Sequence, residues 1–475
     1  MTLRWLEEKV FLFFLATLPW LDLRYFPLAS AFVRPAALFP LVIGLCLMLL
    51  RATVSLPLYL TLLKKMYPWV LLSLALTAIS LMLFHADGQI KERTRLTSAV
   101  RELAGLFVML GGFTYIGHCL TLFRGRSKEI FNGLAIGARI SVVVSLIQIG
   151  WFFLQIEPFV SLGKLVQAVF LFHPQIGKVH GMTPEGSMYA DLSLTLIFPL
   201  FVALWMDGKN EPGVTLGKRL WQIFWLAASL LTLIGTSSRP GLAGLLFVLV
   251  AGTIVGAKKV GKALLRLATL AVASTLLFAG LLLFPKFQSV LKSSFSNFGG
   301  VEEAYAGQNW SNITRAATQL AAVNILISHP IGIGLGQYMF FSHEAMPRWA
   351  FLSPEVRAMY GSYDDPVYCN LIDCTMVYPD PKNMLLRIGL DWTPVALFAA
   401  LSAWCAFLFR SARAMRVNNS SISIYVFYGL LPMPVLALSV ASYMWLHWMF
   451  VFGLAYFAFG ANRPQSVTMF AEKHT

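Results

Sequence analysis

Long apolar runs recur along this chain, and they restrict its fold more than any other feature of the sequence. Each run is about twenty residues long, which is the length that an α-helix needs to cross the hydrocarbon core of a bilayer. The runs lack a strict alternation of apolar and polar residues, so they predict helices rather than the strands of a membrane barrel. Charged residues make up 12% of the chain, about half of the share that is typical of soluble proteins. The sequence therefore predicts an all-α polytopic membrane protein.

The apolar runs divide into about twelve candidate spans. Their ranges are 8–27, 34–50, 67–85, 99–121, 129–155, 186–206, 219–237, 240–257, 263–284, 383–409, 421–440 and 444–461. Between the ninth and tenth spans, the segment 285–382 is polar, aromatic and charged, and it is far longer than an ordinary connection. We therefore expect transmembrane helices 1–9 in residues 1–284, a large loop in 285–382, and helices 10–12 with a tail in 383–475. Within the loop, residues 313–328 have the apolar spacing of a helix with one buried face.

The basic residues predict how these spans are oriented. The net charge is +15, but the Lys and Arg residues fall in short clusters between apolar runs, as orientation signals do, so no nucleic-acid partner is expected. With the N-terminus in the cytoplasm, five successive cytoplasmic loops carry three basic residues each: Arg51, Lys64 and Lys65; Arg124, Arg126 and Lys128; Lys209, Lys218 and Arg219; Lys258, Lys259 and Lys262; Arg410, Arg413 and Arg416. The alternation predicts that both termini are cytoplasmic and that 285–382 and 156–185 lie on the outer side. The first run has acidic residues beside its basic ones and no small-residue cleavage site, so we interpret it as a retained helix.

The cysteines indicate one disulfide and no metal centre. Cys46, Cys119 and Cys405 lie in apolar runs and are expected to be packed thiols. Cys369 and Cys374 lie in the long loop, and a disulfide between them is expected if that loop is outside the cytoplasm. Two thiols at this spacing without a nearby histidine make a poor zinc site, and the chain has no HExxH motif. We therefore predict no metal and no cofactor.

Charged residues within or at the ends of apolar spans are candidates for function, because a charge in lipid is costly. Arg239 begins the eighth span in TSSRPGLAGLL, at the outer face of the membrane, where a guanidinium group could bind phosphate oxygens. The alternative for Arg239 is a side chain that reaches to the interface without a ligand. Arg139 lies inside the fifth span, where pairing with Glu102 or Asp191 is the alternative to a functional role.

A second group of basic residues lies where the chain returns to the membrane. Lys382, Arg387 and Asp391 follow one another at intervals of four or five residues, which is typical of a salt-bridge network on one helix face. The alternative is that Lys382 and Arg387 close a cationic pocket with Arg239 and Arg315.

Three residues are candidates for proton transfer. His343 lies in a polar, aromatic stretch of the loop, and an imidazole can accept a hydroxyl proton near neutral pH. The segment 180–193 brings His180 and Glu185 close to the start of the sixth span, together with Asp191. The alternatives are a solvated loop histidine at 343 and a helix cap with a polar loop in 180–193.

Four short motifs, in this order along the chain, resemble the bacterial O-antigen ligase and polysaccharide polymerase family. They are HGMTPEGSMYA (180–190), SSRPGLAGLL (237–246), Arg315 upstream of HPIGIGLGQY (329–338), and KNMLLRIGL (382–390). The resemblance covers most of the chain in layout but only these four motifs in sequence. The glycines of 329–338 do not match a nucleotide-binding fingerprint, and we expect them to allow a tight turn or a close approach of the backbone.

The resemblance implies a metal-independent glycosyltransferase with a multi-helix, GT-C-like fold in the bacterial inner membrane and a periplasmic large loop. It implies a glycan donor on undecaprenyl diphosphate, an acceptor glycan and, as a further partner, a chain-length regulator protein. By motif, Arg239 and Arg315 carry over as diphosphate ligands. Lys382, Arg387 and Arg139 are further candidates to bind the diphosphate.

The catalytic histidine of the family does not carry over, because Lys382 stands where the motif of the family has His-Asn. His343, Glu185 or His180 would then serve as the base, or activation of the acceptor is mainly electrostatic. This departure favours a polymerase of O-antigen or exopolysaccharide over an O-antigen ligase, which transfers the glycan to lipid A core. A transporter or flippase of lipid-linked oligosaccharides is the alternative from another class of protein, and it would have two pseudo-symmetric halves.

Overall fold

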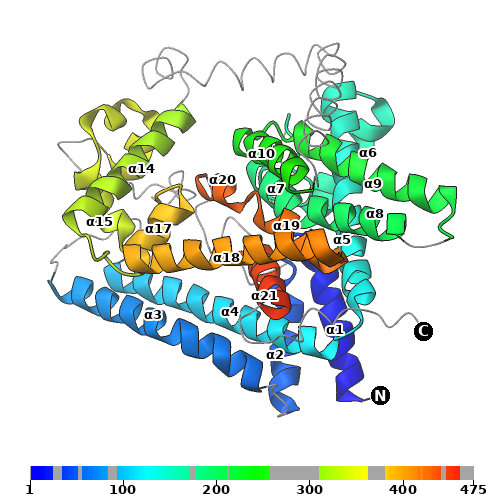
Figure 1. The fold of residues 1–475 in the computed structure, drawn as a ribbon. Helices are drawn as coiled ribbons and strands as arrows, with labels where there is room; N and C mark the ends of the chain where they lie inside the picture. The colour runs from blue at the N-terminus through cyan, green and yellow to red at the C-terminus, as the bar shows by residue number, and fades with distance from the viewer. Residues whose placement is uncertain are drawn as a thin grey trace.

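The computed structural model describes residues 2–24, 35–51, 56–83, 94–171, 177–210, 213–256, 310–361, 380–418, 420–439 and 445–459. Within these ranges the chain forms helices joined by turns, with one isolated bridge between Leu23 and Leu171 and no β-strand (Figure 1). The prediction of an all-α protein is therefore confirmed for the described residues. The predicted ninth span, 263–284, and the expected disulfide of Cys369 with Cys374 lie outside them.

The helices of the first half of the chain are α1 (Leu3–Thr17), α2 (Leu38–Leu50), α3 (Leu56–Leu83), α4 (Arg95–Leu122), α5 (Ser127–Ile149), the π-helical turn η1 (Gly150–Leu154), α6 (Glu157–Phe170), α7 (Gly186–Leu192), the π-helical turn η2 (Ser193–Ile197), α8 (Phe198–Asn210), α9 (Leu216–Gly235) and α10 (Arg239–Gly256). The second half has α14 (Trp310–Ser328), α15 (Tyr338–Ala345), the 3-10 helix η3 (Arg348–Leu352), α16 (Pro354–Tyr360), α17 (Met384–Asp391), α18 (Pro394–Asn418), α19 (Ser421–Leu430), α20 (Met433–Ala437) and α21 (Leu446–Phe459).

Five described helices are long and apolar enough to cross a membrane. They cover Arg95–Leu122, Ser127–Leu154, Gly186–Gly208, Arg239–Gly256 and Pro394–Val417. Four shorter apolar helices accompany them: Leu38–Leu50, Tyr67–Leu83, Ser421–Ala437 and Leu446–Phe459. Helices of this length and composition are consistent with an all-α membrane protein.

Prolines explain where the observed helices differ most from the predicted spans. The first predicted span runs to residue 27, but α1 ends at Thr17, two residues before Pro19. The tenth predicted span is two helices, because α17 ends at Asp391 and α18 begins at Pro394. A proline disfavours the helical conformation at the residue before it, and the helix accordingly breaks at Thr393, before Pro394.

The main apolar core joins α1, α4, α5, η2, α8, α19 and α21, with fully buried aromatic rings such as Phe11, Tyr115, Tyr425 and Phe450. Helices α14 to α17 gather at one side of the molecule, and α10 and α20 lie between them and the α8–α9 pair (Figure 1). Helix α14 packs against α15 and α16 through Ala317 and Ala321, and against α17 through neighbouring apolar residues. Its remaining face is directed toward α10 and α20, and the candidate site lies there.

Candidate anion-binding site between α10 and α14

The start of α10 fixes the position of Arg239. The Ser238 hydroxyl accepts a hydrogen bond from the Gly241 amide at 3.3 Å, and thereby caps the first turn of the helix. Pro240 suits the first turn, because backbone N–H groups in the first turn of a helix have no carbonyl partner within the helix. The N–H group that proline lacks would therefore have formed no helical hydrogen bond. Gly241 lets α10 approach α7, since a β-carbon at this position would lie 2.6 Å from the Ala190 β-carbon. Arg239 is therefore held as the first residue of a helix that is packed closely against α7.

Arg239 and Arg315 come together at this point. The Arg239 Nη1 donates a hydrogen bond to the Asn312 Oδ1 at 2.8 Å. Asn312 and Arg315 are three residues apart on α14, so their side chains lie on the same face, one turn from each other. The hydrogen bond to Asn312 therefore places the Arg239 guanidinium group near the face of α14 that carries Arg315, one helical turn further on. The structure thus brings together two half-buried cations from distant parts of the chain.

Lys382 lies beside the same face of α14. The Gln319 side chain, one turn after Arg315, donates from Nε2 to the Lys382 carbonyl at 3.4 Å and to the Leu438 carbonyl at 3.1 Å. The Lys382 ammonium pairs with Asp380 at 3.3 Å, and the Lys382 amide donates to the other carboxylate oxygen at 2.8 Å. We refer to Arg239, Arg315 and Lys382 as the cationic cluster.

The backbone on both sides of the cationic cluster is strained. Ser237 has a φ of 53° and Lys382 a φ of 48°, and they are two of the four described non-glycine residues with positive φ. This conformation costs roughly 1 kcal/mol or more for a residue with a β-carbon, and it is concentrated at functional sites. The strain indicates that the positions of Arg239 and Lys382 are imposed by the surrounding structure.

Glu185 lies at the same end of the α7–α10 pair as Arg239. A β-carbon at Gly186 would lie 3.1 Å from the Thr236 carbonyl oxygen, while Ala190 meets Gly241 further along. The two helices therefore begin side by side and run in the same direction. The half-buried Glu185 carboxylate accepts a hydrogen bond from the Ser187 hydroxyl. Of the three predicted proton-transfer residues, Glu185 is the one that the described helix packing brings toward the cationic cluster.

His180 is held inside the protein. Its side chain is fully buried, and its Nδ1 lies 2.8 Å from the Thr183 carbonyl oxygen. Its Nε2 lies 3.3 Å from the amide nitrogen of Gln148 and 3.2 Å from that of Gln167. This pattern fits a neutral imidazole that donates from Nδ1 and accepts at Nε2. With both nitrogens bonded and no exposed atom, His180 joins its loop to α5 and α6.

His343 packs on the other side of α14. Its ring lies 5.2 Å from the Phe351 ring and 5.9 Å from the Tyr360 ring, centroid to centroid. These aromatic rings pack with Ala321, which follows Asn312 by nine residues, or two and a half helical turns. His343 therefore packs against the face of α14 that is opposite to Asn312.

Arg387 and Arg139 make contacts elsewhere. Arg387 pairs with Asp391 at 3.3 Å, as expected for the salt-bridge network, and also with Glu102 of α4 at 2.7 Å. Lys382, the third expected member of that network, pairs with Asp380 instead. Arg139 lies over the ring of Trp225, 5.7 Å from its centroid, and not beside a carboxylate. The expected partner Asp191 instead pairs with the His447 imidazole at 3.0 Å.

The glycine-rich segment fastens the α14–α15 unit to α3 and α4. Gly332, Gly334 and Gly336 have φ values of 100°, 86° and 67°, and a β-carbon at Gly334 would lie 2.5 Å from the Thr77 α-carbon. The Leu335 amide donates to the Thr77 hydroxyl at 2.9 Å. The expected tight turn and close backbone approach are therefore observed.

Sequence reasoning missed Asn312 and Gln319, although both lie on the face of Arg315 by helical spacing.

Among the described residues, no group of three or more His, Cys, Asp and Glu side chains could hold a metal ion. Neither a model of a known protein family nor a curated protein sequence matches this chain.

Proposed function

We propose that this chain is a polymerase of a surface polysaccharide, either O-antigen or exopolysaccharide. It transfers a glycan from undecaprenyl diphosphate to a sugar hydroxyl of an acceptor glycan, at the periplasmic face of the inner membrane. The observation that carries this proposal is the convergence of Arg239 and Arg315 between α10 and α14, which are remote in sequence.

A diphosphate matches the cationic cluster in charge and in geometry. Two like charges that are held close together repel each other, and a bound dianion would offset this cost. Guanidinium groups present planar pairs of donors to phosphate oxygens and stay ionised at physiological pH. The neutral amide groups of Asn312 and Gln319 help to orient this face without cancelling its charge. Donors that are fixed before the reaction stabilise a leaving group most effectively.

Glu185 is the residue that we assign as general base. Its carboxylate accepts the proton of the acceptor hydroxyl while the hydroxyl oxygen forms a bond to C1 of the donor sugar. The bond from C1 to the phosphate oxygen breaks, and its electron pair leaves with the diphosphate, whose growing charge Arg239 and Arg315 neutralise. His180 and His343 are less suited, because one is fully buried and the other packs behind α14.

The test uses the full-length chain, purified and reconstituted in liposomes with a lipid-diphosphate oligosaccharide as donor. With a second lipid-linked oligosaccharide as acceptor, the wild-type protein should lengthen the glycan, whereas lipid A core should remain unmodified. The Arg239→Ala variant should lower the initial rate by roughly 100-fold or more, since one ligand of the leaving group is lost. Arg357→Ala, which removes an exposed arginine of α16, is the matched control and should keep the wild-type rate.

Each other outcome would change the proposal. Wild-type rates in Arg239→Ala would remove this residue from the site. Transfer to lipid A core in place of lengthening would identify a ligase. Movement of the donor across the bilayer without any transfer would identify a transporter.

A further inference from the structure

Arg139 is a charged residue that the proposed function does not use. It lies in α5, within the apolar helical stretch Ser127–Leu154. Twelve residues separate it from Ser127, which corresponds to roughly 18 Å along the helix axis. An arginine at this depth is costly in a membrane unless a partner compensates its charge.

The described residues supply no such partner. The Arg139 Nε is buried and makes no hydrogen bond, and no carboxylate of the described chain lies within ion-pair distance of the guanidinium group. The indole Nε1 of Trp225, beneath the arginine, also lacks an acceptor, although this side chain is only 6% exposed. Two hydrogen-bond donors thus lie at the contact of α5 with α9, and the described part of the chain provides no acceptor for either of them.

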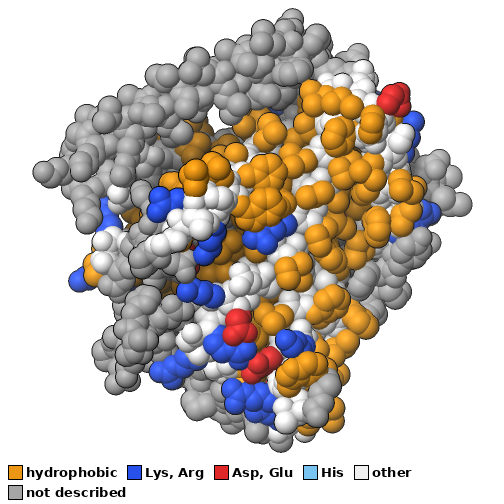
Figure 2. All heavy atoms as spheres, turned by 90° about the vertical axis from the view of Figure 1, so that its right-hand side faces the viewer, with side chains coloured by type: hydrophobic (Ala, Val, Ile, Leu, Met, Phe, Trp, Pro, Cys, Tyr) orange, Lys and Arg blue, Asp and Glu red, His pale blue; other side chains and the backbone are white. Residues whose placement is uncertain are grey.

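Arg139 adjoins an apolar surface. Residues at i−3, i+1 and i+4 on α5 lie within about 100° of it around the helix. These positions and two on α9 carry large exposed side chains: Ile136, Ile140, Val143, Trp221 and Phe224. Figure 2 shows the side of the molecule to which α6, α8 and α9 belong, and its surface is broadly apolar.

We propose that this face of α5 and α9 binds a transmembrane helix of a partner membrane protein, and that an Asp or Glu side chain near the middle of that helix pairs with Arg139. Charge complementarity is the first argument, because the buried Arg139 Nε has no acceptor among the described residues. The depth of Arg139 along the apolar helix is the second argument. The phosphate of a lipid lies at the membrane surface, whereas a carboxylate on a crossing helix can reach the level of Arg139.

A second copy of this chain fits less well as the partner. Within the five candidate spans, the carboxylates away from the span ends are Glu102 and Asp191. Both are already paired, with Arg387 and His447. The partner helix is therefore expected to come from a different protein, and this inference does not depend on the transferase activity.

The experiment uses a synthetic apolar helix of about twenty residues with a central Glu, and its twin with Gln at the same position. Each is labelled and reconstituted with the labelled full-length chain in neutral phosphatidylcholine liposomes, where energy transfer reports association. The Glu helix should bind the wild-type chain about tenfold more tightly than the Gln helix, since charge pairing is strong in a low dielectric. Arg139→Met should abolish this preference, while Lys128→Met, at the exposed end of the same helix, should retain it.

A second variant tests the pairing without removing the arginine. Val143→Glu puts a carboxylate one turn after Arg139 on the same helix, where the two can pair within the chain. The preference for the Glu helix should then disappear, and circular dichroism should report an unchanged helix content.

Equal binding of the two synthetic helices to the wild-type chain would overturn the proposal. A preference that survives in Arg139→Met would overturn it as well, because the carboxylate would then bind elsewhere. If the helices do not discriminate and Arg139→Met releases phosphatidylglycerol that copurifies with the wild type, the arginine binds a lipid headgroup and the partner helix is excluded.

Discussion

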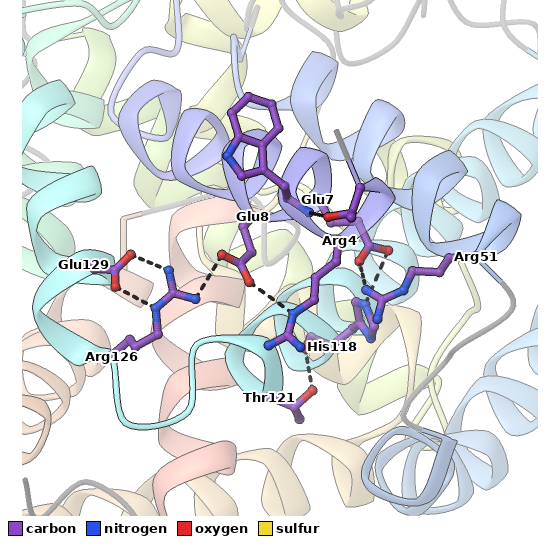
Figure 3. Close-up of polar contacts among 10 residues, drawn as sticks. Arg4, Glu7, Glu8, Arg51, His118, Thr121, Arg126 and Glu129 are labelled. Carbon is purple, nitrogen blue, oxygen red and sulfur yellow. Dashed lines mark hydrogen bonds and ion pairs between the residues drawn. The ribbon is translucent and has the colours of Figure 1, made fainter.

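Around α1, three arginines and three glutamates neutralise one another, whereas the cationic cluster between α10 and α14 brings Arg239 toward a second arginine, Arg315, and contains the ion pair of Lys382 with Asp380. We call the first group the balanced network, and Figure 3 shows it. Its members, with one histidine, are Arg4, Glu7, Glu8, Arg51, His118, Arg126 and Glu129. Both groups connect helices that are distant in sequence, so the difference between them lies in charge.

The balanced network has a partner for each ion. Glu7 is fully buried, and one of its oxygens pairs with Arg51 while the other lies 3.7 Å from the His118 Nε2. Arg126 bonds to Glu129 at 2.6 Å and to Glu8 at 2.9 Å. The hydrogen bonds to these two carboxylates, Glu129 first, raise the pKa of Arg126 further above its usual value, so it remains ionised. A network of this kind joins α1 to the ends of α2 and α4 without needing a ligand.

The difference in charge between the two groups indicates which of them binds a ligand. Where opposite charges pair, the removal of one partner leaves the other charge uncompensated. Such a removal should reduce the free energy of unfolding. Like charges that the fold forces together reduce stability, and they persist where binding or catalysis requires them. The two groups should therefore respond to substitution in opposite ways.

The largest effect is expected for Glu185→Gln, beside the cationic cluster. Loss of the general base should lower the rate of glycan transfer by about 100- to 10,000-fold, while the affinity for the lipid-diphosphate donor stays the same. Initial rates and donor binding in liposomes measure the two quantities. Glu344→Gln, at an exposed carboxylate of α15, serves as the control. An equal loss of donor affinity would show that Glu185 shapes the binding site and is not the base.

Arg315→Met should separate function from stability within the cationic cluster. The rate should fall by about 100-fold, because a ligand of the leaving group is lost. The unfolding temperature should stay the same or rise, because the repulsion between Arg315 and Arg239 is removed. Rate assays and thermal unfolding in detergent check the two expectations. A clear drop in unfolding temperature would mean that Arg315 is a structural residue.

Glu7→Gln should have the reverse profile. The substitution leaves Arg51 and His118 without their buried carboxylate, which should cost about 3 kcal/mol of the free energy of unfolding. The transfer rate per folded molecule should not change. Chemical denaturation in detergent measures the loss. If stability is retained while the rate falls, the network belongs to the functional machinery, and the contrast between the two groups is wrong.

Arg126→Ala should have the smallest effect. Its side chain is 37% exposed, so water and salt screen its two ion pairs, and the loss should stay below about 1 kcal/mol. The loss should shrink further as the salt concentration is raised. If Arg126→Ala lowers the free energy of unfolding as much as Glu7→Gln does, and independently of salt, then solvent exposure does not explain the expected difference between the two positions.

Several helices could be predicted from local sequence alone. The loop helix expected at 313–328 is α14 over Trp310–Ser328, because its apolar spacing repeats with the helical period. The break before Pro394 could also have been predicted, since a proline disfavours helix at the residue before it. Because residues 383–409 form one long apolar run, a single span was predicted there, although α17 and α18 are separate helices.

The candidate site was only partly predictable. Arg239 and Arg315 were named from their motifs, and Asn312 and Gln319 could have been added from the spacing along α14. The position of His343 could not be predicted, because it depends on which face of α14 the following helix packs against. The same holds for Arg387, whose partner Glu102 comes from a distant helix.

By itself, the sequence determined that this chain forms apolar helices of membrane-spanning length, and which of their residues carry charge. The length of an apolar run, its periodicity and the positions of prolines are local properties of the sequence, and they do not depend on how the helices pack. Only the tertiary structure decided which charges come together. Arg239 and Asn312 are 73 residues apart, so their hydrogen bond depends on how α10 and α14 pack, and no local pattern encodes that packing.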